Sequence, residues 1–211
     1  MVDMVDLEKE IWNWEKGSWV NVENLERYTR KVSYEEINQS GWQNVRYLHS
    51  LPANRVKGIE SGCYLSHDGS WVLLYDIEEL SLEEIIHKCS PALSVLWIWD
   101  DRNIEELDLS RFPNMTVLDL AGCKSLRQVY GIALLTQLKR LNLGRTRIAQ
   151  LPDLSKLTKL QELMLFQRPM EQVQGLEKLT GLRYLNLNNT HITQLPGCIR
   201  GMRQLKCLSL C

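Results

Sequence analysis

The sequence predicts a solenoid built from short parallel strands, and three observations carry that prediction. The pattern Leu-x-x-Leu-x-Leu, or a variant with Met or Ile, begins five times, at Leu93, Met115, Leu138, Leu160 and Leu182. The starts are 22, 23, 22 and 22 residues apart, and a sixth at Leu205 follows after 23. Between the starts, apolar residues recur about every third position. A fixed period of roughly 20 to 29 residues with this leucine spacing is the signature of a leucine-rich repeat.

Each coil is expected to open with one short strand whose alternating leucines point into the core, while the residues between them face outward. The chain must then bend. One residue of each coil is predicted to occupy the same position in this bend, and we call these five the ladder residues: Asp101, Cys123, Thr146, Arg168 and Thr190. A small side chain that bonds neighbouring backbone groups suits such a bend. Arg168 does not fit and precedes Pro169, so we expect an irregular bend in the fourth coil.

The backs of the coils are expected to be short. Ile148, Leu151, Leu154, Leu157 and Leu160 recur every third position, which fits 3₁₀ or extended backs better than α-helices. Pro152 and Pro196 also argue against long helices. The predicted fold class is therefore α/β, a leucine-rich repeat horseshoe with its parallel sheet on the concave side.

The chain divides into two predicted regions. Residues 70–211 hold one degenerate coil, five regular coils and a truncated one, and the stop in mid-coil leads us to expect a fragment or truncated relative. Residues 1–69 form an N-terminal segment, with a short helix over 4–14 and possible strands around 32–34 and 45–48. All seven Trp residues lie in the first 99 positions. We therefore expect this segment to cap the first regular coil by packing on Trp97 and Trp99. A capping-box pattern at Ser81 predicts a helix through Ile85 and Ile86.

Charge is uneven along the chain. Residues 1–119 carry 22 acidic and 11 basic side chains, a net of −11, whereas residues 120–211 carry 4 and 14, a net of +10. Two interpretations remain open: two solvated surfaces of opposite sign, or basic coils that steer an acidic partner. The six cysteines form no CxxC pair, and the N-terminus is acidic rather than signal-like. Reduced thiols and a cytoplasmic, intracellular location are expected.

The sequence predicts a non-enzymatic protein-interaction module. It contains no phosphate-binding loop and no nucleophile elbow, so no cofactor and no catalytic residue is expected. His191, Cys198, Cys207 and Cys211 match no common zinc spacing, so no metal is expected either. The predicted protein-binding positions on the concave strand face are Arg140, Asn142, Glu162, Met164, Phe166, Tyr184 and Asn186. The alternative is an ordinary exposed sheet with scattered apolar residues.

Several stretches resemble one family. Residues 112–126, 138–152 and 182–196, with the succession F-x-x-M-x-x-L-D-L and then L-N-L-x-x-T-x-I-x-x-L-P, resemble the first coils of plant nucleotide-binding leucine-rich-repeat disease resistance proteins of the coiled-coil class. Residues 89–98 resemble the coil that opens that domain, and residues 30–34 its linking strand. The resemblance implies a role in plant defence and innate immunity: sensing of a pathogen or host protein, and autoregulation by packing on an acidic nucleotide-binding switch domain. Because that switch domain is missing here, ATP binding is not carried over.

Two alternatives stay open for the function: the substrate-receptor part of a ubiquitin ligase, whose coils also use Cys at the bend as Cys123 does, and a generic cytosolic scaffold. A nucleic-acid partner is not favoured, because Arg140 alone among the basic residues of these coils falls on the predicted strand face. No membrane partner is expected, since no apolar run approaches the roughly 20 residues of a spanning helix.

Overall fold

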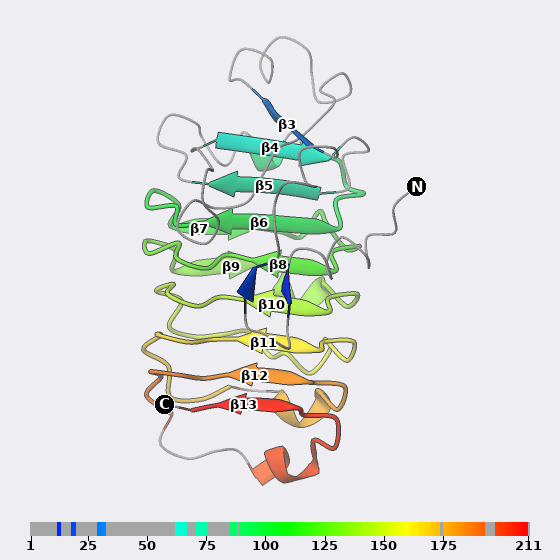
Figure 1. The fold of residues 1–211 in the computed structure, drawn as a ribbon, viewed down its shortest axis with the longest axis vertical. Helices are drawn as coiled ribbons and strands as arrows, with labels where there is room; N and C mark the ends of the chain where they lie inside the picture. Colours follow the sequence, from blue (N-terminus) through cyan, green and yellow to red (C-terminus); the bar gives the residue numbers. More distant parts are fainter. Residues whose placement is uncertain are drawn as a thin grey trace.

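The fold is a stack of coils with one long sheet along one side (Figure 1). The computed structural model describes residues 12–13, 18–19, 29–32, 62–66, 71–75, 85–87, 89–173, 175–192 and 197–210. The strands of the long sheet are β3 (Thr29–Val32), β4 (Gly62–Ser66), β5 (Trp71–Tyr75), β6 (Val95–Trp99), β8 (Val117–Asp119), β10 (Arg140–Asn142), β11 (Glu162–Met164), β12 (Tyr184–Asn186) and β13 (Cys207–Ser209). The order is β13-β12-β11-β10-β8-β6-β5-β4-β3.

The register of this sheet follows the repeat. From β5 to β13 each strand pairs in parallel with the next, and equivalent positions of neighbouring coils face one another, as in Arg140 opposite Glu162 and Glu162 opposite Tyr184. β4 pairs antiparallel with β5, and β3 antiparallel with β4. The predicted parallel-sheet solenoid is confirmed, with an antiparallel extension at its N-terminal end.

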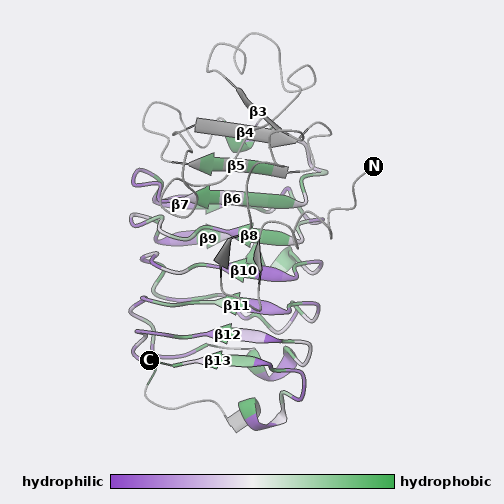
Figure 2. Cartoon of the chain, in the orientation of Figure 1, coloured by the Kyte–Doolittle hydropathy of each residue, from purple (hydrophilic) through white to green (hydrophobic). Residues whose placement is uncertain are grey.

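The core lies between the sheet and the backs of the coils. Leu118, Leu141, Leu163 and Leu185, which occupy one position of successive coils, are at most 1% exposed. Each coil needs its two neighbours to complete the burial of its leucines, so the stack rather than the single coil is the stable unit. Figure 2 shows a difference between the strands: β6 begins with hydrophobic residues, whereas β10, β11 and β12 begin with hydrophilic residues.

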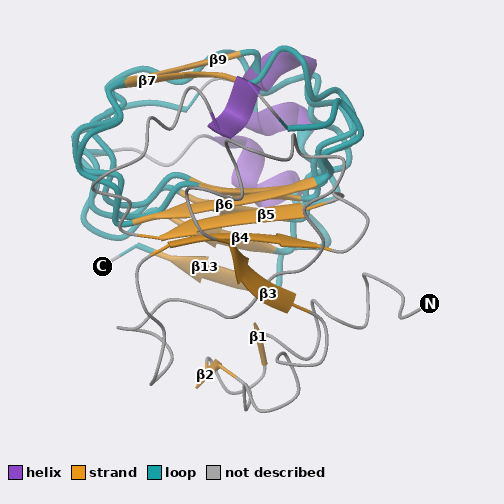
Figure 3. Ribbon diagram, turned by 90° about the horizontal axis from the view of Figure 1, so that it is seen from above, coloured by secondary structure: helices purple, strands orange, loops and turns teal. Residues whose placement is uncertain are grey.

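The backs are short, as the sequence predicts. Figure 3 shows them on the side of the molecule opposite the sheet. They contain the 3₁₀ helices η2 (Ile132–Leu134), η3 (Leu176–Lys178) and η4 (Gly197–Gly201) and the paired strands β7 (Glu106–Asp108) and β9 (Gln128–Tyr130). η2 and η3 follow Gly131 and Gly175, whose φ values of 82° and 83° favour glycine. A Cβ on Gly131 would also lie 2.6 Å from the backbone nitrogen of Ser110.

The bend after each strand has the same construction in every regular coil. The residue before the ladder position takes a positive φ at Asp100, Gly122, Arg145, Gln167 and Asn189. The ladder side chains then bond the backbone, as the small residues predict. The Oγ1 atoms of Thr146 and Thr190 donate to carbonyls three residues earlier at 2.8 Å, and the Cys123 thiol donates to the Ile98 carbonyl at 3.3 Å. Asp101 accepts two backbone N–H bonds at 2.9 and 2.8 Å.

The fourth bend requires a correction. Its backbone is regular at the turn, because Gln167 has a positive φ of 52°, as the equivalent residues of the other coils have positive φ values. The backbone of Arg168 also forms a parallel β-bridge with Thr190 of the next coil. The irregularity lies in the Arg168 side chain, which is 1% exposed. Its Nη2 donates to the Ile148 carbonyl, while Nε and Nη1 find no hydrogen-bond partner in the described part of the chain. Desolvation by burial lowers the pKa of Arg168 from its usual value to about 10.

The leading region differs in part from expectation. The helix predicted over 4–14 is wrong at its end, because Trp12–Asn13 forms β1 and pairs antiparallel with β2 (Ser18–Trp19). A helix of so few residues is marginal in water, and tryptophan favours strands. β3 overlaps the strand expected around 32–34, and residues 85–87 are helical at Ile85 and Ile86. The possible strand at 45–48 and the capping box at Ser81 lie outside the described residues.

Candidate protein-binding surface

The outward-facing side chains of β6, β8 and β10 to β13, together with those of the residues directly after each strand, form a surface that we call the sheet face. Its exposure changes along the stack. On β6, Val95, Trp97 and Trp99 are 0%, 5% and 2% exposed, and on β8 Val117 and Asp119 are also buried. From β10 onward the face is half-buried or open, at Arg140, Glu162, Met164, Phe166, Tyr184, Asn186 and Asn188. The accessible sheet face therefore begins at Arg140.

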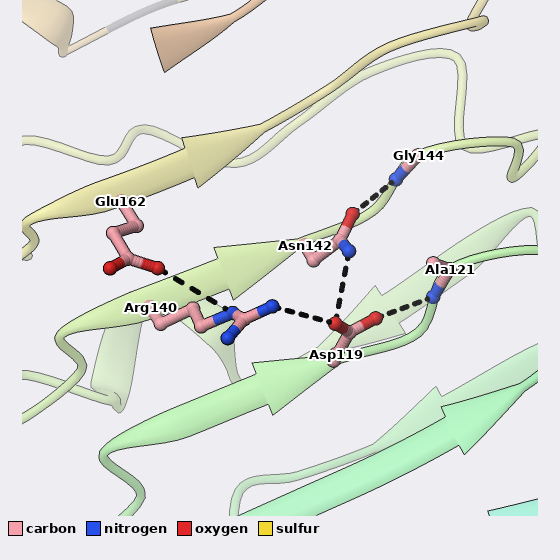
Figure 4. A network of polar contacts seen from close by, with 6 residues as sticks. All are labelled: Asp119, Ala121, Arg140, Asn142, Gly144 and Glu162. Carbon is pink, nitrogen blue, oxygen red and sulfur yellow. Dashed lines mark hydrogen bonds and ion pairs between the residues drawn. The ribbon is translucent and has the colours of Figure 1, made fainter. Parts of the chain in front are cut away.

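A polar network fixes the boundary between the buried and the accessible parts of this face (Figure 4). The fully buried carboxylate of Asp119 accepts hydrogen bonds from the Ala121 backbone N–H at 3.1 Å and from Asn142 Nδ2 at 3.0 Å. The guanidinium of Arg140 approaches the same carboxylate at 3.5 Å and Glu162 Oε2 at 3.6 Å. Arg140 is thus held between two carboxylates of neighbouring coils, and its orientation is fixed before any partner arrives.

Asn142 lies below the surface rather than on it. It is 1% exposed, its amide nitrogen donates to Asp119, and its Oδ1 accepts the Gly144 N–H at 3.1 Å. Asn142 therefore supports the sheet face from beneath, while its predicted neighbours Arg140 and Glu162 remain accessible.

The same turn recurs at the ends of the strands. Asp119, Asn142 and Asn186 each accept the backbone N–H two residues later, at 3.1, 3.1 and 3.0 Å. Met164 occupies the equivalent position of β11 and cannot do so. Sequence reasoning missed this role, although Asp or Asn in the middle of Leu-x-Leu was its visible signal. At Met164 the sheet face therefore has a flexible apolar side chain, where the neighbouring coils have an amide that bonds the backbone.

Phe166 lies on the backbone of the preceding coil. The space that a Cβ on Gly144 would fill is occupied by the Phe166 ring. The Arg145 guanidinium lies 6.0 Å from the ring centroid, and Arg145 Nε donates to Gln167 Oε1 at 2.5 Å. The ring is therefore positioned by a glycine below it and a cation beside it, and it remains partly accessible.

The two indoles at the start of the sheet face form a pair of their own. The ring centroids of Trp97 and Trp99 are 6.3 Å apart, with an interplanar angle of 43°. Both are buried, but the segment 1–69 that we expect to pack on them falls largely outside the described residues. Their role in N-terminal packing stays a prediction, as do the domain boundaries.

Cys89, Cys123 and Cys207 form no disulfide, and they differ in their burial. Burial raises the pKa of Cys89 to about 12, and burial followed by the charge of Asp101 raises the pKa of Cys123 well above its usual value. Cys207 is exposed.

Among the described residues, no group of three or more His, Cys, Asp or Glu side chains is placed to hold a metal ion. No helix in that part of the chain has the length and apolar character needed to cross a membrane.

Together, the coil period, the in-register parallel sheet and the ladder bends define a leucine-rich repeat solenoid. A family model described as Leucine Rich Repeat matches residues 181–202. Among solved structures, internalin C2 of Listeria monocytogenes is 25% identical over 67% of this chain and 61% of its own, with a TM-score of 0.55. An internalin F of the same species is 23% identical over 60% of this chain and 37% of its own, with a TM-score of 0.48. No curated protein sequence matches the chain.

A leucine-rich repeat protein of Leptospira interrogans is 22% identical over 61% of this chain and 39% of its own, with a TM-score of 0.49. These similar structures are bacterial, and the chain spans about three fifths (61%) of the length of internalin C2. The likeness to plant immune receptors is therefore carried by the sequence motifs alone.

Proposed function

We propose that this chain is a non-enzymatic protein-binding module and that it binds its partner through the sheet face from Arg140 to Tyr184. One observation carries the proposal: the accessible part of the face begins at Arg140, and there an ion pair, two aromatic rings and a methionine share one surface. Aromatic residues and arginine are enriched among the residues that dominate binding energy at protein interfaces. Solenoids of this kind typically serve as extended binding surfaces.

The rigidity of this surface supports the proposal. The Arg140 guanidinium is held by Asp119 and Glu162, and the Phe166 ring is seated on Gly144. Side chains that are already ordered lose little conformational entropy on association, whereas each freely rotating side chain costs about 0.5–1.5 kcal/mol. Backbone hydrogen bonds between neighbouring strands hold the coils that present them. A partner would therefore meet a surface organised in advance.

The partner class is a protein, and the finer assignment rests on the motifs at 112–126, 138–152 and 182–196. On that basis we propose a ligand-sensing or autoregulatory repeat domain of a plant-type intracellular immune receptor, or a truncated relative, whose ligand is a pathogen or host protein. An acidic nucleotide-binding switch domain is a second partner that the resemblance implies.

The test is affinity capture from an extract of the source organism with the purified chain as bait, followed by calorimetry with the retained protein. The double variant Phe166→Ala/Tyr184→Ala should lose the partner, with affinity reduced by about 30-fold or more if the two rings together contribute roughly 2 kcal/mol. The backbone at both positions sits in or beside a regular strand, so circular dichroism should stay unchanged.

The matched control is Tyr130→Ala/Leu134→Ala, which removes two side chains on the backs of the coils that are 47% and 53% exposed. This variant should bind as the wild type does. If Phe166→Ala/Tyr184→Ala still binds the partner and Tyr130→Ala/Leu134→Ala does not, the binding site lies on the backs of the coils. That result would overturn the proposal.

A further inference from the structure

The cations of the later coils gather on one edge of the solenoid. We define the basic edge as residues 133–139, 155–161, 177–183 and 200–206, the segments that lead from the backs into β10, β11, β12 and β13. They contain eight basic side chains, Lys139, Lys156, Lys159, Lys178, Arg183, Arg200, Arg203 and Lys206, and one acidic side chain, Glu177. All eight cations are exposed. Figure 2 shows hydrophilic residues along this edge, at the N-terminal ends of β10 and β11.

Backbone hydrogen bonds hold this edge in register. The N–H of Lys139 donates to Thr116, that of Gln161 to Lys139, that of Arg183 to Gln161 and that of Lys206 to Arg183, at 2.7 to 2.8 Å. Lys139, Arg183 and Lys206 therefore stand in one column. At about 4.8 Å per strand step, the column spans roughly 14 Å from Lys139 to Lys206.

Within the described residues the charge of this edge is offset in part at Lys156, which contributes, after the hydrogen bonds from Ser155, to the lowered pKa of Asp153. The ion pairs there join Arg140 to Asp119 and to Glu162, both on the sheet face, and none involves a cation of the basic edge. Lys159 donates instead to the amide oxygen of Gln137 at 2.5 Å. The opposite edge, where the strands end, carries fewer exposed cations in the same coils, Lys124, Arg127, Arg145 and Arg147, beside the acid Glu171. The excess of positive charge is therefore larger on the basic edge.

We propose that the basic edge is a docking site for an acidic segment of a protein partner. Its charge calls for an anion, and it borders the sheet face directly, since Lys139 precedes Arg140 and Arg183 precedes Tyr184. A nucleic acid is the less favoured anion, because the edge segments contain no aromatic side chain on which a base could stack. Between the cations, the exposed positions Thr136, Thr158 and Thr180 supply hydroxyl groups rather than apolar contacts.

The probe is a labelled, end-capped peptide of about eight residues in which Glu alternates with Thr, long enough to span the column when extended. Fluorescence anisotropy with the full chain should detect binding at about 0.05 M salt, and the affinity should fall as salt rises to about 0.15 M, where the screening length is about 8 Å. The same peptide with Gln in place of Glu should not bind. Reversal of the column in Lys139→Glu/Arg183→Glu/Lys206→Glu should weaken binding by at least about tenfold.

The matched control reverses three exposed cations of the opposite edge, Lys124→Glu/Arg127→Glu/Arg147→Glu, with the same change in net charge. It should bind the peptide within about twofold of the wild type. Equal losses of affinity in the two triple variants would mean that net charge alone attracts the peptide, and absence of binding at low salt would equally overturn the site.

Tighter binding of a duplex DNA of about 20 base pairs than of the peptide at 0.15 M salt would assign the edge to nucleic acid instead. Phe166→Ala/Tyr184→Ala should keep peptide binding, which separates this proposal from the sheet-face proposal.

Discussion

Replacing Arg168 with threonine should stabilise the solenoid. Arg168 holds the ladder position of the fourth coil, where the third and fifth coils use Thr146 and Thr190. Both threonines donate Oγ1 to a strand carbonyl at 2.8 Å, whereas the Arg168 guanidinium is buried with two nitrogens that lack a partner among the described residues. In Arg168→Thr, the new hydroxyl would reach the carbonyl of Leu165 in the same way.

The size of the effect follows from four contributions. Lowering the pKa of Arg168 from its usual value to about 10 corresponds to about 3 kcal/mol of unfavourable free energy at neutral pH, at about 1.4 kcal/mol per pH unit. Losing the bond to Ile148 costs about 1 kcal/mol, and the new threonine bond returns about the same. The smaller side chain leaves roughly 60 Å³ empty, which costs about 1.5 kcal/mol. The variant should therefore gain about 1.5 to 2 kcal/mol.

Urea denaturation followed by circular dichroism measures this gain, and the thermal midpoint should rise by about 3–8 °C for a chain of this size. The gain should shrink above pH 10. There the buried guanidinium of the wild type loses its proton in the folded state while the unfolded chain keeps it, so the stability of the wild type rises with pH from this group.

Arg147→Thr provides the control, because Arg147 is an exposed cation in the preceding bend, and its loss should change stability by less than about 0.5 kcal/mol. If Arg168→Thr instead destabilises the chain by 1 kcal/mol or more, the guanidinium must be well paired. Arg168 would then not be a buried charge that lowers the stability of the fold.

Three further outcomes are expected. Gly131→Ala should lower the free energy of unfolding by about 1–3 kcal/mol, because it forces a side chain into a positive φ against backbone, while Gly181→Ala, with ordinary contacts at 3.7 Å, should change it by less than 1 kcal/mol in urea denaturation. Asp119→Ala should cost about 2–4 kcal/mol by leaving Asp119's hydrogen-bond donors buried without their acceptor, and a loss under 0.5 kcal/mol in the same assay would contradict the network. At pH 8 a maleimide should label exposed Cys207 in the folded chain and spare Cys123, whose pKa burial raises, as mass spectrometry can verify; early labelling of Cys123 would contradict its burial.

The coil architecture could be predicted because each coil repeats the same physical problem. Leucines at fixed spacing specify strand, register and core together, and the positions of Leu141 and Leu163 follow from counting residues. The short backs followed from a period of three and from two prolines. The ladder roles of Thr146 and Thr190 followed from small polar side chains at the bend.

Single side chains were harder to predict, because their environment comes from neighbouring coils rather than from their own. The burial of Asn142 depends on Asp119, one coil earlier and 23 residues away in sequence. The backbone at Arg168 stays regular because the left-handed residue before it repeats in every coil, which the sequence does not reveal at Gln167. The expected helix over 4–14 was wrong at Trp12, where a cross-strand partner decides the conformation.

The sheet face and the basic edge share a border, and this adjacency constrains any partner. An interface of standard size buries about 800 Å² on each side, so a protein seated on Phe166 and Tyr184 would extend over neighbouring coils and reach Lys139 or Arg183. Rim charges act mainly on the association rate, whereas buried aromatic anchors act mainly on dissociation. Reversal of edge cations should therefore slow association in a salt-dependent way, while loss of the two rings should speed dissociation at any salt concentration. A partner whose two rates respond together to both changes would mean that the edge and the face form one site.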